Sequence, residues 1–309
     1  PEPDDNPGTP ERVALGRRLF RERLLSRDRS LACVDCHQPD RAFTDGRARS
    51  VGVFGRRGPR SVPTLVNRAW GEAFFWDGRI ATLEEQVLQP IVARHEMDLP
   101  VEQAVGRLRG TKGYSEGFRE AFGRDVSVED LARALAAYVR TIEAGASPYD
   151  RYVWGERDAL SPEAREGLRL FRGKANCTVC HTGPNLTDEE LHNTGVSWGR
   201  QPYDSGRRMA TGLSKDTGRF KTPTLREIEH TAPYMHDGSL RTLQDVIDFY
   251  DRGGNANPYR DRELRPLSLT AFEKRALLGF LKSLSGQVRD GVESLATSPP
   301  GLSFALADR

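Results

Sequence analysis

The chain has 309 residues, of which 37% are hydrophobic, and its 46 Lys and Arg residues nearly balance its 44 Asp and Glu residues, leaving a formal net charge of +2. This length is sufficient for two domains, and the balanced charge argues against nucleic acid or an anionic membrane as a partner. No run of 18 apolar residues occurs, so we expect no membrane-spanning helix and a soluble protein.

The first informative segment is residues 33–37, which read Cys-x-x-Cys-His and follow a predicted helix over residues 16–21. Two thiols three positions apart on one turn can each add to a haem vinyl group, while the imidazole of the next residue reaches the iron. We therefore predict that Cys33 and Cys36 attach a c-type haem and that His37 is its proximal iron ligand.

The rest of the chain predicts further helices and one boundary. A serine cap and an apolar face predict a helix over residues 127–141, and the small residues of segment 144–148 predict a domain boundary. Ser161 stands before a proline and should start the helix that leads to the second motif. A capping box predicts a helix over residues 270–284, and the apolar periodicity is lost after residue 287.

The second motif, residues 177–181, repeats Cys-x-x-Cys-His and uses the remaining two of the four cysteines. Cys177 and Cys180 are predicted to attach a second haem, with His181 as its proximal ligand. The alternatives are one four-cysteine zinc site or two redox dithiols of the thioredoxin type. A histidine directly after both cysteine pairs favours two covalently bound c-type haems.

Both motifs lie in repeated sequence. Each follows Gly-x-Arg-Leu-Phe-Arg and precedes Pro-Thr-Leu and an Asp-Gly turn with Thr-Leu behind it. The matching segments are residues 16–21 and 167–172, residues 63–65 and 223–225, and residues 75–83 and 235–243. Ordered matches of this kind predict an internal duplication. The predicted fold is therefore mainly α, with two homologous cytochrome c-like haem domains.

The two halves differ where each would face the open side of its haem. Pro90 stands fourteen residues after Trp76, whereas Tyr250 stands fourteen residues after His236. Proline has no donor atom, while tyrosine offers a phenolate oxygen. We therefore expect the first haem to keep an open site for peroxide and Tyr250 to close the second, with Met235 as the competing ligand.

The chain resembles bacterial dihaem cytochrome c peroxidases over nearly its whole length, and within them the MauG-like branch. The segments that carry the resemblance are the two haem motifs, residues 75–79 with Gln86, Pro90 and Glu96 downstream, and residues 231–238 running to Tyr250. In ordinary peroxidases of the family, methionine occupies the position of Tyr250. Tyrosine at this position is similar to the MauG-like branch. A phenolate stabilises ferric and higher iron states, whereas a thioether favours ferrous iron, so we expect the second haem to be able to lose an electron beyond Fe(III).

The resemblance implies roles for residues around the first haem. Glu96 matches the family's acid-base residue, with His95 as a weaker rival, and Gln86 would position water or peroxide. Trp76 matches a tryptophan that relays electrons between the haems. Ordinary peroxidases need reduction to release a histidine from the first haem, but Val53 stands at that position, so we expect an open first haem in the ferric protein.

The route by which electrons reach the haems from a partner is not indicated by the resemblance. MauG-like proteins carry a surface tryptophan two residues before the first cysteine of the second motif, and here that residue is Ala175. Trp154, Trp198 and Tyr203 are candidates for this route by residue type alone.

The family also binds a calcium ion between its domains. The resemblance implies that the backbone carbonyls of Thr231 and Pro233 hold it, with Ser61 in place of the usual asparagine. Haem attachment through thioethers is normally completed outside the bacterial cytoplasm. We therefore expect a periplasmic protein whose signal segment has been removed before Pro1.

The resemblance implies an enzyme that uses hydrogen peroxide to form a high-valent bis-Fe(IV) state and then oxidises a residue, expected to be tryptophan, on a partner protein at long range. The expected parts are a peroxide-reactive haem domain over residues 1–146, an electron-transfer haem domain over residues 147–287, and a surface-packed tail over residues 288–309. The alternatives are a cytochrome c peroxidase fed by a small donor protein and a non-catalytic dihaem electron carrier.

Overall fold

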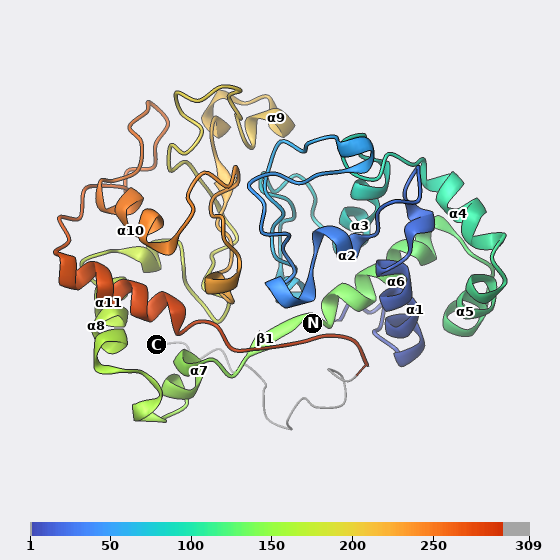
Figure 1. The fold of residues 1–309 in the computed structure, drawn as a ribbon, viewed down its shortest axis with the longest axis horizontal. Coiled ribbons are helices and arrows are strands. Elements are labelled where there is room, and N and C mark those ends of the chain that lie inside the picture. The colour runs from blue at the N-terminus through green and yellow to red at the C-terminus, as the bar shows by residue number, and fades with distance from the viewer. Residues whose placement is uncertain (1, 293–309) are drawn as a thin grey trace.

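The structure, a computed structural model, describes residues 2–292 and is rich in helices (Figure 1). The helices are α1 Pro10–Phe20, α2 Cys33–Cys36, α3 Leu83–Val92, α4 Val101–Arg109, α5 Lys112–Phe122, α6 Val128–Arg140, α7 Pro148–Val153, α8 Pro162–Arg172, α9 Arg208–Thr211, α10 Leu243–Asp251 and α11 Ala271–Lys282. The strands are β1 Glu143–Gly145, β2 Leu191–His192, β3 Phe220–Lys221 and β4 Gln287–Arg289. The prediction of a mainly α fold is confirmed. No described helix is long and apolar enough to cross a membrane.

Three helices begin at the residues that the sequence predicts as caps. The side chain of Ser127 accepts the N–H of Asp130 at the start of α6, and that of Ser161 accepts the N–H of Ala164 at the start of α8. Thr270 forms a capping box with the third residue of α11. Each cap satisfies a backbone N–H that has no partner inside the helix, so the starting residue is fixed locally.

Two helix pairs cross at very short distance. A Cβ atom placed on Gly16 of α1 would lie 2.0 Å from the carbonyl oxygen of Ala134 in α6. A Cβ atom placed on Gly167 of α8 would likewise lie 2.0 Å from the carbonyl oxygen of Ala276 in α11. Only glycine fits at such a contact, so these two residues determine how closely each pair packs.

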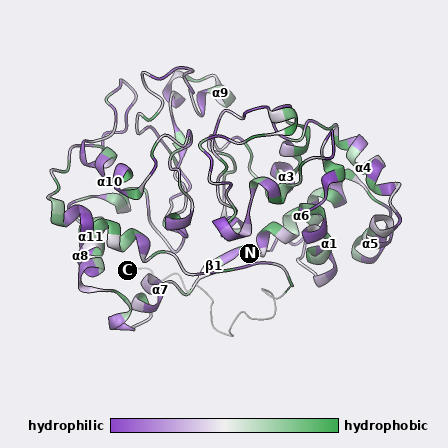
Figure 2. Ribbon diagram, in the orientation of Figure 1, coloured by the Kyte–Doolittle hydropathy of each residue, from purple (hydrophilic) through white to green (hydrophobic). Residues whose placement is uncertain are grey.

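The buried apolar residues form two cores. The first is built from α1 and α3 to α6, with Leu19, Phe118 and Tyr138 fully buried, and the second from α8, α10 and α11, with Phe280 at its centre. Figure 2 shows hydrophobic and hydrophilic residues alternating along the helices that enclose these cores. Each half therefore has apolar packing of its own.

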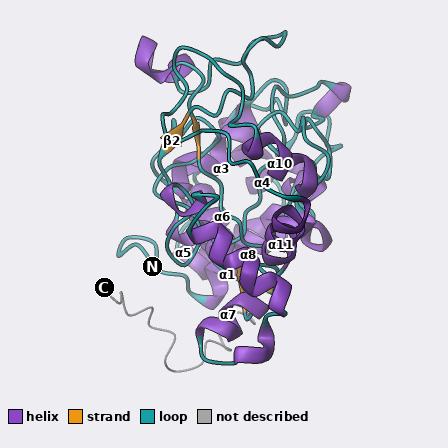
Figure 3. Ribbon diagram, turned by 90° about the vertical axis from the view of Figure 1, so that its left-hand side faces the viewer, coloured by secondary structure: helices purple, strands orange, loops and turns teal. Residues whose placement is uncertain are grey.

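Loops build the side of the molecule opposite most of the helices. Figure 3 shows loops filling the upper part of the molecule, while the main helices occupy its lower and middle parts. The loops come mostly from the segments between α2 and α3 and between α8 and α10. Five isolated bridges and the pair β2 and β3 are the extended pairings within these loops. The irregular segments are therefore held mainly by turns and side-chain hydrogen bonds.

The segment predicted as a domain boundary, residues 144–148, contains the end of strand β1 and the start of α7. Strand β1 pairs antiparallel with β4, and α7 begins immediately afterwards with Ser147 as its cap. The sequence showed no strand here because the partner of β1 comes from the far end of the chain. The C-terminal segment continues along the first half, where the hydroxyl group of Tyr138 donates to Asp290 at 2.5 Å. The predicted surface-packed tail stays a prediction, and its residues 293–309 lie outside the described part.

The glycine contacts lead to a test with a matched control. Gly16→Ala and Gly167→Ala should each destabilise the protein by about 1–3 kcal/mol, because the added methyl group forces the helices apart. Gly106→Ala in α4, where nothing lies within 4 Å of the added atom, should leave stability equal or slightly higher. Thermal unfolding followed by circular dichroism compares the three variants. Equal melting temperatures would show that the close crossings do not limit stability.

Candidate functional site

Both Cys-x-x-Cys-His motifs open into one cavity. Its volume is about 1030 Å³, and residues of both halves line it. Small-molecule sites usually occupy about 300–1,000 Å³, so this space exceeds what one ordinary ligand needs. The residues of the motifs that line the cavity are Cys33, Cys36, His37, Cys177, Cys180 and His181.

The first motif forms a short helix followed by its histidine. Helix α2 contains both cysteines, and His37 follows as its terminal residue. The His37 Nδ1 atom lies 2.9 Å from the carbonyl oxygen of Phe43, which can only accept, so Nδ1 carries the proton and Nε2 keeps a free lone pair. Burial lowers the pKa of His37. A neutral, oriented imidazole of this kind fits an iron ligand.

The second motif repeats this arrangement. Cys177–Val179 form one 3-10 turn, and the Nδ1 atom of His181 lies 2.9 Å from the carbonyl oxygen of Leu186. Burial lowers the pKa of His181 to about 4. The ring centroid of Phe171 lies 6.4 Å from that of His181, as Phe20 does from His37 in the first half. Both histidines therefore present Nε2 in the same way.

The cysteines fit attachment of a group rather than a zinc site. All four are free thiols, and burial raises the pKa of Cys33, Cys36 and Cys177 to about 12. Within residues 2–292 the four thiols do not converge on one point, as a four-cysteine zinc site requires. Each pair instead faces the shared cavity beside its own histidine, which is the donor set that a covalent haem requires.

Three residues are predicted for the open side of the first haem, and they lie on α3 or shortly after it. Gln86, Pro90 and Glu96 all line the cavity. The carboxyl group of Glu96 lies 3.5 Å from Nε2 of His95, which also lines the cavity. Val53 is buried, does not line the cavity, and donates its N–H to the carbonyl oxygen of Glu96 at 2.8 Å.

Trp76 lies where the two halves meet. Its indole N–H donates to the carbonyl oxygen of Ser61 at 3.0 Å, and its own carbonyl oxygen accepts the N–H of Lys221 at 2.7 Å. Its ring centroid lies 6.4 Å from that of His236, with the planes inclined by 68°. Trp76 therefore contacts the C-terminal half directly and faces the same cavity as both motifs.

Tyr250 and Met235 both line the cavity in the C-terminal half. Tyr250 lies on α10, and its hydroxyl group makes no hydrogen bond with any other described residue. Burial raises the pKa of Tyr250, so the isolated phenol is neutral, and only a nearby cation such as a metal ion would favour its ionised form. The phenol oxygen is thus available to a group in the cavity.

The three predicted calcium ligands also line the cavity. The hydroxyl group of Ser61 donates to the carbonyl oxygen of Met235 at 3.0 Å, which leaves its lone pairs available. The carbonyl oxygens of Thr231 and Pro233 accept no hydrogen bond from residues 2–292. Three oxygen donors in one region fit the preference of calcium for oxygen ligands.

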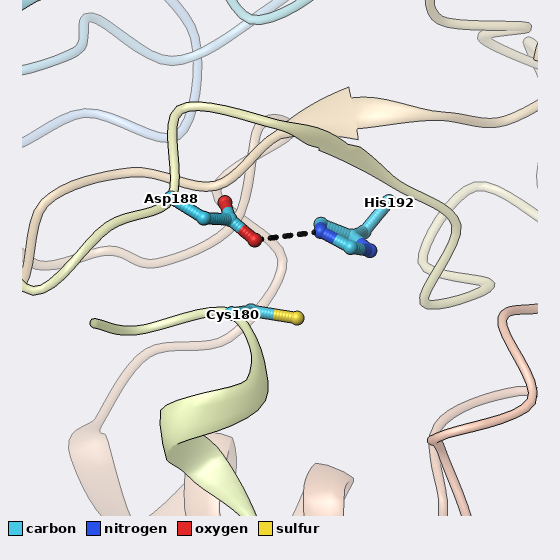
Figure 4. Close-up of side chains that lie close together, drawn as sticks. All are labelled: Cys180, Asp188 and His192. Atoms are coloured by element: carbon cyan, nitrogen blue, oxygen red, sulfur yellow. Dashed lines mark hydrogen bonds and ion pairs between the residues drawn. The ribbon is translucent and has the colours of Figure 1, made fainter.

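A charged group beside the second motif was missed by the sequence analysis. The Nδ1 atom of His192 lies 2.5 Å from Asp261 and its Nε2 atom 3.0 Å from Asp188, close to the thiol of Cys180 (Figure 4). The hydrogen bond to Asp261 above all, then the interaction with Cys180 and last that with Asp188, raise the pKa of His192 to about 11. Both ring nitrogens of His192 already have a carboxylate partner, so His192, Asp188 and Asp261 form an ion-pair triad, and no nitrogen is left to bind a metal ion. Only the spacing of Asp188 and His192 is visible in the sequence.

Buried ion pairs join the two halves around the cavity. Arg60 of the first half binds Asp77 at 2.7 Å and Asp204 of the second half at 2.8 Å. Arg68 binds Glu189 of the second half at 2.9 Å. These pairs have side-chain exposures of 18% or less, so water screens them little. The pairs Arg60–Asp204 and Arg68–Glu189 thus connect the loops of the two halves.

Comparison with known proteins agrees with this geometry. The profile of the family "Di-haem cytochrome c peroxidase" matches residues 10–158. The methylamine utilization protein MauG of Methylorubrum extorquens is 40% identical over 291 residues, covering 93% of this chain and 82% of the relative. The cytochrome-c peroxidase IdrP1 of a Pseudomonas species is 37% identical over 319 residues, covering 92% of this chain and 83% of the relative.

A solved structure, described as a MauG-like protein associated with microbial copper homeostasis, has a TM-score of 0.87 at 34% identity and covers 97% of this chain and 95% of that chain. These relatives indicate two haems, hydrogen peroxide as a reactant and a partner protein, rather than a non-catalytic electron carrier. The chain therefore belongs to the di-haem cytochrome c peroxidase/MauG family and is a peroxide-dependent dihaem oxidoreductase.

Proposed function

We propose that this enzyme uses hydrogen peroxide to oxidise its two haems and then removes electrons from a residue, tryptophan by preference, on a partner protein. When bound, the two haems would supply the reaction with peroxide and store its two oxidising equivalents as a bis-Fe(IV) state. The observation that carries the proposal is the free phenol of Tyr250 in the cavity beside the second motif.

Covalent attachment of both haems is part of this proposal. Cys33 and Cys36 would bind the first haem, with Nε2 of His37 on its iron, and Cys177 and Cys180 would bind the second, with Nε2 of His181. The carbonyl oxygens that hold each Nδ1–H keep the imidazoles neutral and fixed in orientation.

Tyr250 would set the behaviour of the second haem. A phenolate on iron stabilises oxidised states, whereas a methionine at this position would favour a reduced haem that feeds electrons to peroxide. The second haem would then store an oxidising equivalent instead of supplying an electron. This argument favours the MauG-like function over the ordinary peroxidase.

Glu96 would move the proton in the reaction with peroxide. A carboxylate can take a proton from the near oxygen and return it to the far oxygen as the O–O bond breaks. Gln86, on the same side of the cavity, would position the peroxide, and Pro90 offers no atom that could occupy the open iron site. The buried Val53 has no donor atom in its side chain either, so it would not have to leave the iron before peroxide binds.

Trp76 would connect the two haems electronically. Its contacts with both halves place an easily oxidised indole at their junction, and the hydrogen bond to Ser61 fixes the ring. An aromatic ring in this position shortens each electron-transfer step between the two sides of the cavity.

The domain organisation is proposed on the repeated sequence and the repeated contacts. Residues 1–146 would form the peroxide-reactive haem domain, residues 147–287 the electron-transfer haem domain, and residues 288–309 a tail. Gly16 and Gly167 make the same close helix contact in the two halves, which supports an origin by internal duplication.

A calcium ion and a periplasmic location complete the proposal. The carbonyl oxygens of Thr231 and Pro233, with Ser61, would hold the ion between the domains. Covalent haem attachment supports a periplasmic location, because that chemistry is normally completed outside the bacterial cytoplasm.

A cytochrome c peroxidase fed by a small donor protein is the second candidate, favoured by the peroxidase relatives. The two functions differ in whether the fully ferric protein reacts. Equimolar hydrogen peroxide without reductant should rapidly change the Soret band and produce a long-lived near-infrared band, which stopped-flow spectroscopy records. Trp76→Phe should weaken the near-infrared band. Inertness until one haem is reduced would favour the ordinary peroxidase instead.

Replacing the second axial ligand should change the second haem alone. Tyr250→Met should raise its potential by on the order of 0.1–0.3 V, within the range of about 0.8 V that axial ligands span. Spectroelectrochemical titration measures both haems. Met235→Leu is the matched control and should leave both potentials unchanged. A changed potential in Met235→Leu and an unchanged potential in Tyr250→Met would identify Met235 as the ligand.

Removing the acid-base group should slow the first step. Glu96→Gln should reduce the rate of reaction with peroxide by about 10²–10⁴-fold, the usual contribution of a positioned proton-transfer group. Glu85→Gln, an exposed change on α3 outside the cavity, is the control and should leave the rate unchanged. If His95→Asn slowed the reaction with peroxide and Glu96→Gln did not, the proton-transfer role would belong to His95.

A further inference from the structure

Three oxidisable aromatic side chains lie together on the surface of the C-terminal half. The ring centroids of Trp198 and Tyr203 are 6.0 Å apart and those of Trp198 and Tyr259 are 6.4 Å apart, with inclined planes in both pairs. Trp198 and Tyr203 are each 38% exposed, and Tyr259 is 40% exposed. We call these three residues the surface aromatic cluster. Each of its rings is accessible to a molecule outside the protein.

A continuous set of contacts joins this cluster to Trp76. Ser197, next to Trp198 in the chain, has its hydroxyl oxygen 2.8 Å from Nε2 of the buried His236. The ring of His236 stacks on Phe220 at 3.7 Å and lies 6.4 Å from the ring of Trp76. The route therefore consists of one ring contact, one hydrogen bond and one peptide connection.

The route suits transfer of a positive hole. The connecting residues are buried, because His236 is 3% exposed and Ser197 is 5% exposed. Tyr203 adds a second connection, because its side chain both lines the cavity and belongs to the exposed cluster.

The position of the family's surface tryptophan and the other candidate, Trp154, lack such a connection. Ala175 is only 7% exposed and has no oxidisable side chain. Trp154 is 59% exposed, but within residues 2–292 it makes no ring contact and does not line the cavity. Exposure alone would favour Trp154, whereas connection to the cavity favours Trp198.

We propose that the surface aromatic cluster is the site at which electrons enter this enzyme, and that they pass from Trp198 through the contacts of Ser197 and His236 to Trp76. The proposal rests on the peroxide-dependent function proposed above and names the surface used by its partner. The donor would be an oxidisable aromatic side chain of the partner protein, placed against the exposed cluster.

The electrons balance over one cycle. One hydrogen peroxide takes up two electrons and two protons and yields two water molecules. Each electron leaves the cluster toward Trp76, and a phenol or indole proton passes to solvent. The partner side chain returns one electron in each step and the cluster regains its proton from solvent, so the cluster is restored and the partner loses two electrons and two protons. Without a partner, Trp198 itself loses two electrons and two protons, and a water oxygen adds to its indole ring.

The first test maps where the enzyme oxidises itself. The protein carrying both haems is treated with hydrogen peroxide without reductant or partner, and tryptic peptides are analysed by mass spectrometry. Added oxygen should appear at Trp198 and its neighbours severalfold more than at Trp154, although Trp154 is more exposed. Oxidation that follows exposure, with Trp154 ahead of Trp198, would overturn the proposed route.

Variants separate the route from the proposed function. Trp198→Phe should lengthen the lifetime of the peroxide-oxidised haem spectrum about tenfold, which corresponds to about 1.4 kcal/mol in activation free energy, while Trp154→Phe should not change it. Ser197→Ala should lower oxidation at Trp198 with the indole still present. If the wild-type haem spectrum responds to peroxide but Trp198→Phe and Ser197→Ala have no effect, the route is overturned and the proposed function stands. A wild-type spectrum that does not respond to peroxide would overturn the proposed function and the route together.

Discussion

The close contact of two glycine-bearing helices with their partners positions both histidines of the motifs. Because Gly16 lets α1 touch α6, Phe20 at the end of α1 packs 5.1 Å from Tyr138 and 6.4 Å from His37. The imidazole is therefore placed by the helix pair as well as by its own loop. The corresponding contacts of the second half involve Gly167, Phe171, Phe280 and His181.

The two halves differ where they touch. Trp76 and His236 occupy equivalent positions in the repeated sequence, and their rings meet at the junction. An indole loses an electron readily, whereas a buried neutral imidazole does not. Equivalent positions of the repeated sequence thus carry two different side chains, and under the proposed function only the indole of Trp76 would carry the charge between the haems.

The parts of the site that follow from the sequence are those encoded locally. Ser127 and Ser161 start their helices with hydrogen bonds to residues three positions away, and each motif places its histidine next to its cysteines. The remaining features join residues far apart in the chain and leave no local pattern. Asp261 reaches His192 across 69 positions, so only the folded chain reveals that pair.

The same limit applies to the strands and to the surface. Residue type alone singled out Trp198 and Tyr203, but Tyr259 and the link through His236 depend on how separate loops pack. Strand β1 was not predicted, because three residues of ordinary composition become a strand only when β4 lies beside them.

The pairing of β4 with β1 also implies an order of assembly during synthesis. The ribosome completes α6 long before it adds residues 287–291, yet the hydroxyl groups of Tyr138 and Thr141 find their partners Asp290 and Gly291 only there. Until then the end of α6 faces water. The N-terminal half therefore acquires its final surface only after the last residues of the C-terminal half have been made.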